Sequence, residues 1–258
     1  MPGLYDRADI YDLLENEERY GWYKRHWETV LRGTGVRSLL DVSIGSGSVT
    51  LPLAELGVEL SGSDLSGAML DSCAKKAGGR GLQVELKRSD FRDLSCWAGR
   101  VFDCAASTGN SLAYVTNGEV EDVLARMDAL VRPGGYLYFD TRSWDAILAS
   151  RQRFYLYNPF FHGEDRVNLV QVWDYPADGS VVFNLLYTFE RDNRIFQKEV
   201  FEERYHPIPR RLLLNRLAEL GYGDVRQFPF PACSKQPPEQ AEWYCVLARK
   251  PSKTAEGS

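Results

Sequence analysis

The stretch Leu39-Leu40-Asp41-Val42-Ser43-Ile44-Gly45-Ser46-Gly47-Ser48 decides the fold. It begins with apolar residues that suit a buried strand and continues into a turn with two glycines. An amphipathic pattern follows at 49–56 and predicts a helix. Because glycine lets the backbone turn tightly and approach a ligand closely, this strand, turn and helix are typical of the ligand-binding edge of an open α/β sheet.

Outward from this stretch, short apolar runs alternate with helical patterns. We expect strands at 38–43, 58–64, 84–90, 101–108 and 136–141, and helices at 49–56, 66–77 and 119–131. Gly134 and Gly135, after Pro133, indicate a tight turn before the fifth strand. With a helix at 210–220 and two closing strands at 225–230 and 243–248, the pattern predicts a doubly wound α/β fold with a mostly parallel seven-stranded sheet.

Three aromatic-rich segments interrupt this alternation. Residues 168–175, 181–190 and 195–205 alternate apolar with polar positions and are separated by turn sequences. They predict an antiparallel β meander inserted after the fifth strand, over the ligand edge of the sheet. A loop is expected at 231–238.

The composition favours a small-molecule ligand. The 258 residues carry a net charge of −5, which gives no basic field for nucleic acid. No apolar run approaches the roughly 20 residues of a membrane span, and no signal peptide is visible, so we expect a cytoplasmic protein. Five scattered cysteines and three distant histidines show no metal-ligand spacing, and no metal is expected.

Acidic residues recur at the ends of the second and third strands. Asp64 is placed to accept hydrogen bonds from ribose hydroxyls, and Asp90 from an exocyclic amine, with Phe91 stacking on a purine. Either acid taken alone is as well explained as a helix N-cap. A dinucleotide-binding turn is the main competitor, but its third glycine is Thr50 here, and a phosphate-binding P-loop is excluded because no GK[ST] follows.

These residues resemble the motifs of class I S-adenosylmethionine-dependent methyltransferases, although Ser43 and Ser46 depart from the commonest form of the turn. The resemblance implies S-adenosylmethionine as cofactor and S-adenosylhomocysteine as product. It implies these cofactor-binding residues: Tyr11, Arg19, Asp41, Ser43, Gly45, Gly47, Asp64, Leu65, Met69, Asp90, Phe91, Ser107, Thr108 and Ser111.

Two further segments follow the fourth and fifth strands, Gly109-Asn110-Ser111 and Asp140-Thr141-Arg142. Asn110 offers a donor and an acceptor, and Arg142 offers a fork suited to a carboxylate, although a salt bridge from Arg142 to Asp140 or Asp145 explains it equally well. Both segments are similar to those of glycine and glycine/sarcosine N-methyltransferases. The resemblance implies catalytic roles for Asn110, Arg142 and Tyr187, and substrate contacts from Tyr114, Tyr155, Tyr157 and Tyr205.

The sequence pattern divides the chain into a cofactor-binding core at 38–150, the inserted substrate-side subdomain at 151–207, the closing helix and strands at 208–250, and a disordered tail at 251–258, and the resemblance implies lid helices at 1–37. We expect an N-methyltransferase of a small amino acid such as glycine or sarcosine. Ser143, Trp144 and Tyr114 depart from the family and keep open another carboxylate-bearing amine or a natural-product acid. A non-catalytic cofactor-binding protein and a homo-oligomer also stay open.

Overall fold

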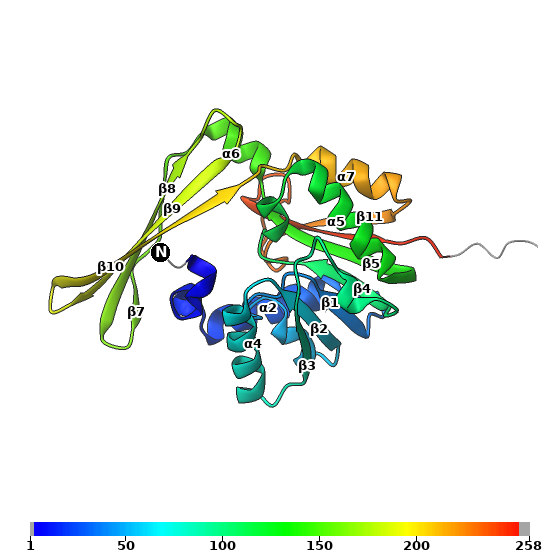
Figure 1. Ribbon diagram of the computed structural model, residues 1–258, viewed down its shortest axis with the longest axis horizontal. Helices are drawn as coiled ribbons and strands as arrows, with labels where there is room; N and C mark the ends of the chain where they lie inside the picture. Colours follow the sequence, from blue (N-terminus) through cyan, green and yellow to red (C-terminus); the bar gives the residue numbers. More distant parts are fainter. Residues whose placement is uncertain (1–2, 253–258) are drawn as a thin grey trace, which may run out of the picture.

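The computed structural model describes residues 3–252 and contains two β-sheets (Figure 1). Sheet A has seven strands in the order β11-β12-β5-β4-β1-β2-β3. Its parallel strands are β1 (Ser38–Asp41), β2 (Glu59–Asp64), β3 (Val84–Arg88), β4 (Phe102–Ser107) and β5 (Val131–Arg142), and β11 (Gly223–Pro229) and β12 (Trp243–Arg249) close the sheet through antiparallel pairs. The chain leaves β1 for β2 and β3 and returns on the other side with β4, which places a topological switch point between β1 and β4.

Helices cover both faces of sheet A because neighbouring strand residues point to opposite faces. On one face, Leu39 and Tyr138 pack with α2 (Glu17–Val30), α3 (Leu51–Glu55) and α4 (Gly67–Gly79). On the other face, Leu40 and Phe139 pack with α5 (Asn117–Ala129) and α7 (Arg210–Glu219). The result is the three-layer arrangement that the alternation of strands and helices predicts.

Side-chain caps fix where three helices begin. Asn16 accepts a hydrogen bond from the backbone N–H of Arg19 at the start of α2, and Ser66 accepts one from Met69 at the start of α4. Thr116 and Glu119 form a reciprocal capping box at the start of α5. The cap of α4 follows the end of β2 within two residues, so it also positions the loop there at the ligand edge.

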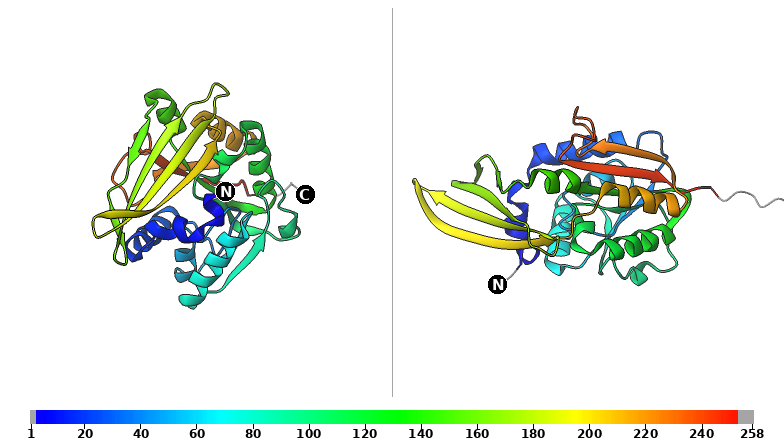
Figure 2. Two further views of the ribbon diagram at one scale, coloured as in Figure 1. Left: turned by 60° about the vertical axis from the view of Figure 1, so that its left-hand side comes forward. Right: turned by 90° about the horizontal axis from the view of Figure 1, so that it is seen from above.

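Sheet B is antiparallel and projects from the core (Figures 1 and 2). Its strands are β6 (Phe154–Leu156), β7 (Phe160–His162), β8 (Asp165–Asp174), β9 (Val181–Arg191) and β10 (Arg194–Tyr205), and α6 (Trp144–Ser150) links them to β5. The rings of Trp173 and Phe183 stack 4.3 Å apart on its inner face, in the same apolar cluster as Phe139 of sheet A. Sheet B is therefore fixed to the core by shared packing.

The N-terminal segment lies between sheet B and the helices of the core (Figure 2). It consists of the short helices η1 (Leu4–Asp6), α1 (Ala8–Tyr11) and η2 (Asp12–Leu14) and leads into α2. Leu4 and Ile10 are buried and join the core cluster. The remaining short helices are η3 (Ser95–Trp97) and η4 (Ser111–Tyr114).

The fold class expected from the sequence is confirmed, with three differences. β5 begins at Val131, because Pro133 and its glycines form an irregularity inside the strand and not a turn before it. A Cβ at Gly135 would lie 2.7 Å from the carbonyl oxygen of Asp103, so only glycine allows β4 and β5 to approach there. The meander has five strands instead of three, and helix α6 was not expected. Of the tail expected at 251–258, residues 253–258 lie outside the described residues.

Candidate functional site

Two neighbouring cavities lie at the carboxyl ends of the strands of sheet A. The first cavity, of about 650 Å³, lies over the ends of β1, β2 and β3 and is lined by Ser43, Asp64 and Phe91. The second cavity, of about 500 Å³, lies between the N-terminal segment, the end of β5 and sheet B. Tyr5 lines both cavities, so its ring stands at the boundary between them.

Asp41 lies beneath the first cavity and holds the turns that form its floor. Its Oδ2 accepts a hydrogen bond of 2.7 Å from the Thr108 hydroxyl, and its Oδ1 accepts one from the backbone N–H of Ser43. Complete burial raises the pKa of Asp41 to about 6. The Ser43 hydroxyl lies 3.0 Å from that of Ser107 and accepts a hydrogen bond from the Thr108 N–H. These contacts tie the turn after β1 to the turn after β4.

The two glycines of the first turn have different roles. Gly45 has a φ of +54°, and nothing lies within 4 Å of the place where its Cβ would be. At Gly47 a Cβ would lie 2.7 Å from the Sγ of Cys73, so this glycine lets α4 pack against the turn. Met69, predicted as a cofactor contact, is fully buried in the core and lines neither cavity.

Asp64 links the end of β2 to both adjoining turns. Its Oδ2 accepts a hydrogen bond of 2.9 Å from the Gly45 N–H, and its Oδ1 accepts one of 2.9 Å from the Ser66 N–H. Desolvation raises the pKa of Asp64, and the backbone hydrogen bonds oppose that shift. Leu65, beside it, is 61% exposed and lines the first cavity. The carboxylate thus faces the first cavity and also holds its rim.

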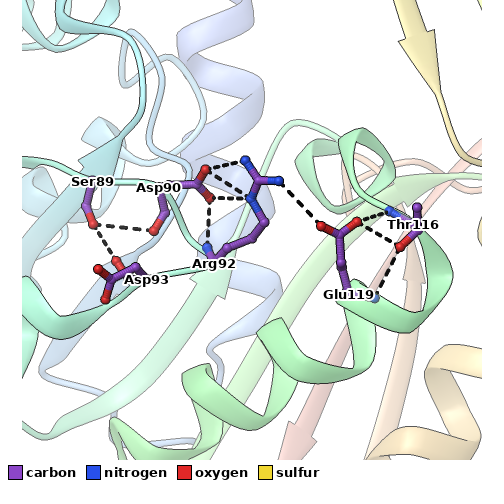
Figure 3. A network of polar contacts seen from close by, with 6 residues as sticks. All are labelled: Ser89, Asp90, Arg92, Asp93, Thr116 and Glu119. Atoms are coloured by element: carbon purple, nitrogen blue, oxygen red, sulfur yellow. Dashed lines mark hydrogen bonds and ion pairs between the residues drawn. The ribbon is translucent and has the colours of Figure 1, made fainter.

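Asp90 faces the first cavity while paired with Arg92 (Figure 3). The Arg92 guanidinium donates to both carboxylate oxygens, which lowers the pKa of Asp90. Arg92 also reaches Glu119, 3.4 Å away, and Glu119 caps α5 together with Thr116. A ligand amine at Asp90 would share that carboxylate with Arg92.

Asn110 is held so that only its amide N–H groups face the second cavity. It has a φ of +63°, a left-handed conformation, and its backbone N–H donates to the buried Asp140. Its Oδ1 accepts three hydrogen bonds, from the Thr141 hydroxyl at 2.9 Å, the Arg142 N–H at 3.0 Å and the Trp144 indole N–H at 3.2 Å. With the oxygen saturated, Asn110 can offer a ligand donors only.

Arg142 lies among aromatic rings and has no carboxylate partner within residues 3–252. Its guanidinium carbon is 4.9 Å from the centre of the Trp243 ring, 5.2 Å from that of Phe183 and 5.7 Å from that of Trp173. The two acids near it in sequence are bonded elsewhere, Asp140 to the Gly109 N–H and Asp145 to the Arg210 N–H, and Glu242, which lines the same cavity, accepts a hydrogen bond from Tyr155. An unpaired arginine in a cavity is suited to an anionic group of a ligand.

The predicted tyrosines divide between the two cavities. Tyr155, Tyr157, Tyr187 and Tyr205 line the second cavity, together with Tyr11 and Arg19 of the N-terminal part. Tyr114 lines the first cavity, with Ser111. Tyr187 is 3% exposed, and its hydroxyl makes no hydrogen bond within the part of the chain that the structure describes.

Three residues of the site are not among those predicted from the sequence. Tyr5 donates or accepts a hydrogen bond of 2.8 Å with the hydroxyl of Tyr114. Glu15 lines the second cavity 3.6 Å from Arg19. Glu203 is buried beside Tyr114. The one available signal was at Glu203, an acid in an inward position of an otherwise alternating strand.

The described residues contain no group of three or more His, Cys, Asp or Glu side chains that could hold a metal ion. No helix in the described range has the length and apolar character needed to cross a membrane.

Comparisons with known proteins show what the chain is similar to. Residues 39–135 match the family described as "Methyltransferase domain". The chain is 28% identical over 160 residues to glycine N-methyltransferase of Rattus norvegicus, covering 56% of this chain and 54% of the relative. It is 27% identical over 241 residues to the glycine/sarcosine/dimethylglycine N-methyltransferase of Actinopolyspora halophila, covering 87% of this chain and 39% of the relative.

The fold has solved counterparts. An S-adenosylmethionine-dependent methyltransferase from Clostridium acetobutylicum superposes with a TM-score of 0.74 at 18% identity, covering 95% of this chain and 98% of that one. The chain spans about half the length of the curated relatives that it matches first. Residues 39–135 thus match a methyltransferase domain, and the methyltransferase fold predicted from the sequence is confirmed.

Proposed function

We propose that this chain is an N-methyltransferase that transfers a methyl group to the neutral amine of a small amino acid such as glycine or sarcosine. The observation that carries the proposal is the unpaired, aromatic-enclosed guanidinium of Arg142 beside the amide donors of Asn110. Both groups favour an acceptor that bears a carboxylate. Tyr hydroxyls, which can accept as well as donate, are left to orient the amine, and Tyr187 has an unoccupied hydroxyl at this cavity.

In the proposal, S-adenosylmethionine occupies both cavities. In the proposal the first cavity takes the adenosine, with Asp64 at the ribose and Phe91 against the base, and the boundary at Tyr5 lies near the sulfur. Arg19 lines the second cavity, and its Nε makes no hydrogen bond but lies 3.6 Å from the Glu15 carboxylate, so a carboxylate of the methionine part would share this guanidinium with Glu15. Bound S-adenosylmethionine supplies a methyl group already activated on a positively charged sulfur, so these residues need only hold the amine in line and keep water out.

Binding and turnover test the proposal together. We expect calorimetry to show S-adenosylmethionine binding, and sarcosine to be methylated faster than dimethylamine, which lacks only the carboxylate arm. The rate should rise with pH toward the pKa of the amine, because only the neutral amine is nucleophilic. Absence of cofactor binding, or equal rates with and without the carboxylate, would contradict the proposal.

Arg142 provides the sharpest variant. Arg142→Lys keeps the charge but loses the two-pronged geometry, and we expect kcat/KM for the amino acid to fall roughly 10- to 100-fold, as for a lost charged hydrogen bond. The affinity for S-adenosylmethionine should stay unchanged. Arg211→Lys, at an exposed arginine of α7, is the matched control and should behave as the unmodified protein does. An Arg142→Lys variant with full kcat/KM would remove the carboxylate site from the proposal.

A larger carboxylate-bearing amine or natural-product acid is the alternative acceptor. The second cavity of about 500 Å³ is roomy for glycine, and Trp144 and Ser143 stand where the glycine enzymes resembled here have other residues. A panel of amino acids of increasing size separates the two proposals, since the preferred acceptor should have the highest kcat/KM.

A further inference from the structure

A buried carboxylate outside the cavities is connected to the second cavity by two phenols. Glu203 is 8% exposed, and its Oε2 accepts a hydrogen bond of 3.0 Å from the hydroxyl of Tyr114. The Tyr114 hydroxyl lies 2.8 Å from that of Tyr205, which lines the second cavity with Arg142 and Asn110. A continuous hydrogen-bonded chain therefore runs from the acceptor side of the site to Glu203.

Glu203 stands where its strand should carry an apolar residue. Phe201, Glu203 and Tyr205 alternate on the inward face of β10, while Glu202 and Arg204 between them face solvent. No Lys or Arg of the described residues pairs with Glu203. Burial without a cation raises the pKa of Glu203, and the hydrogen bonds from Tyr114 and the Leu4 N–H oppose that shift. Because burying a carboxylate without a cation costs free energy, the presence of Glu203 at this position suggests a functional role.

The negative charge of Glu203 determines which hydroxyl donates in each of these hydrogen bonds. A phenol has one proton, so Tyr114 must donate it to the carboxylate and accept from its neighbours. The Tyr114 hydroxyl is also oriented as a donor toward Tyr205, 2.8 Å away, but its single proton is held more strongly by the charged carboxylate of Glu203. Tyr5, 2.8 Å from Tyr114, and Tyr205 are then left to donate to Tyr114. The Tyr205 oxygen then has a free lone pair toward the second cavity. It can accept a hydrogen bond from an N–H of the acceptor amine, but it does not donate to the nitrogen lone pair that attacks the methyl group.

We propose that Glu203 is a positioning residue and proton acceptor that receives, through Tyr114 and Tyr205, the proton which the acceptor ammonium must lose before methyl transfer. This inference rests on the proposed function. A proton passes from the ammonium to the Tyr205 oxygen, the Tyr205 proton passes to Tyr114, and the Tyr114 proton passes to Glu203. The amine and Glu203 end neutral, both tyrosines are unchanged, and no oxidant or reductant is needed.

The groups that face Glu203 are the phenol of Tyr5 from η1, the phenol of Tyr114 from η4 and the phenol of Tyr205 from its own strand. Arg7 of the N-terminal segment is paired with Asp9 and Glu199 instead. A proton arriving on Glu203 therefore meets no fixed positive charge from these neighbours.

Glu203→Gln tests the relay through the shape of its pH profile. We expect kcat for the amino acid to fall roughly 10- to 100-fold near pH 7 and far less near pH 9.5, where the amine arrives already neutral. KM for S-adenosylmethionine should not change. Tyr205→Phe should give the same convergence at high pH. The exposed neighbour Glu202→Gln is the matched control and should follow the unmodified protein at every pH.

Two results would overturn the relay. One is a Glu203→Gln loss that is equal at all pH values. The other is the same convergence in Glu242→Gln, which would assign the proton to Glu242, an acid lining the second cavity beside Tyr155. If the unmodified protein methylates no amine, the proposed function fails by itself.

The ionisation of Glu203 can then still be tested by stability. Because its folded pKa is raised, the stability it contributes at low pH is lost as pH rises, so Glu203→Gln should gain melting temperature relative to the unmodified protein from pH 4 to pH 7. A difference in melting temperature that does not change with pH would overturn the ionised Glu203 on which the relay depends.

Discussion

Ser43 and Ser46 differ from the residues common in this turn, and both hydroxyls have defined partners. Ser43 accepts from the Thr108 N–H and so joins β1 to β4. Ser46 donates a hydrogen bond of 2.6 Å to Asp12 of the N-terminal segment. The departures leave the glycine conformations intact and add hydrogen bonds to the turn, because a hydroxyl on a short side chain can reach neighbouring segments.

Asp64 is expected to be the acid on which cofactor binding depends most. Asp64→Ala removes a carboxylate that lines the first cavity and that holds the Gly45 and Ser66 N–H groups. We expect the Kd for S-adenosylmethionine, measured by calorimetry, to rise roughly 10- to 100-fold. Asp71→Ala, at an exposed position of α4, is the control. Equal affinities in both variants would show that Asp64 does not serve the cofactor.

At the scale of elements, the N-terminal segment is bonded to the glycine turn through one side chain. Asp12 accepts hydrogen bonds from the Ser46 hydroxyl, the Ser72 hydroxyl at 2.8 Å and the Lys76 ammonium at 2.7 Å. Lys76 in turn donates to Ser46 and Ser48. Three elements that are distant in sequence, η2, the turn after β1 and α4, thus share one polar cluster beside the site.

Removing the Asp12 carboxylate should weaken the attachment of the N-terminal segment and expose the cavities beside it. Asp12→Ala leaves the Lys76 ammonium and two serine hydroxyls without their common acceptor, so we expect faster proteolysis near residues 3–16 and roughly 10-fold weaker S-adenosylmethionine binding. Limited proteolysis and calorimetry measure both effects. Glu18→Ala, exposed at the start of α2, should change neither. An Asp12→Ala variant as protected as the control would mean that the segment is held by Leu4 and Ile10 alone.

How far the sequence predicts these elements depends on whether their cause is local. The strand and glycine turn at 39–48 were predictable because hydrophobic period and glycine placement are local properties. The placement of Arg142 and Asn110 in one cavity followed from the rule that parallel strands end at one edge. The Asp12 cluster and the Glu203 chain were not predictable, since their partners lie 28 to 91 positions apart and meet only through tertiary packing.

At the scale of the whole molecule, two carboxylates lie in the middle of sheet A, and neither pairs with a cation from residues 3–252. Asp41 and Asp140 are fully buried, at the ends of β1 and β5. Hydrogen bonds offset part of the cost of burying Asp140. Its Oδ1 accepts from the backbone N–H groups of Gly109 and Asn110 and from the indole N–H of Trp243. Even so, desolvation raises the pKa of Asp140 to about 7 and that of Asp41 to about 6, so both titrate in the physiological range.

Stability should therefore depend on Asp140 between pH 4 and pH 7. Its folded pKa is raised, so the unfolded chain releases the proton first, and the stability present at low pH is lost as pH rises through about 7. Each pH unit between the unfolded and folded pKa values corresponds to about 1.4 kcal/mol, so Asp140→Asn should gain roughly 3–6 °C in melting temperature over the unmodified protein for each pH unit from pH 5 to pH 7. His26, whose pKa burial lowers to about 3, opposes this trend in both proteins and cancels in the difference. Asp122→Asn, exposed on α5, should show no such change, and a pH-independent difference for Asp140→Asn would mean that Asp140 is ionised throughout.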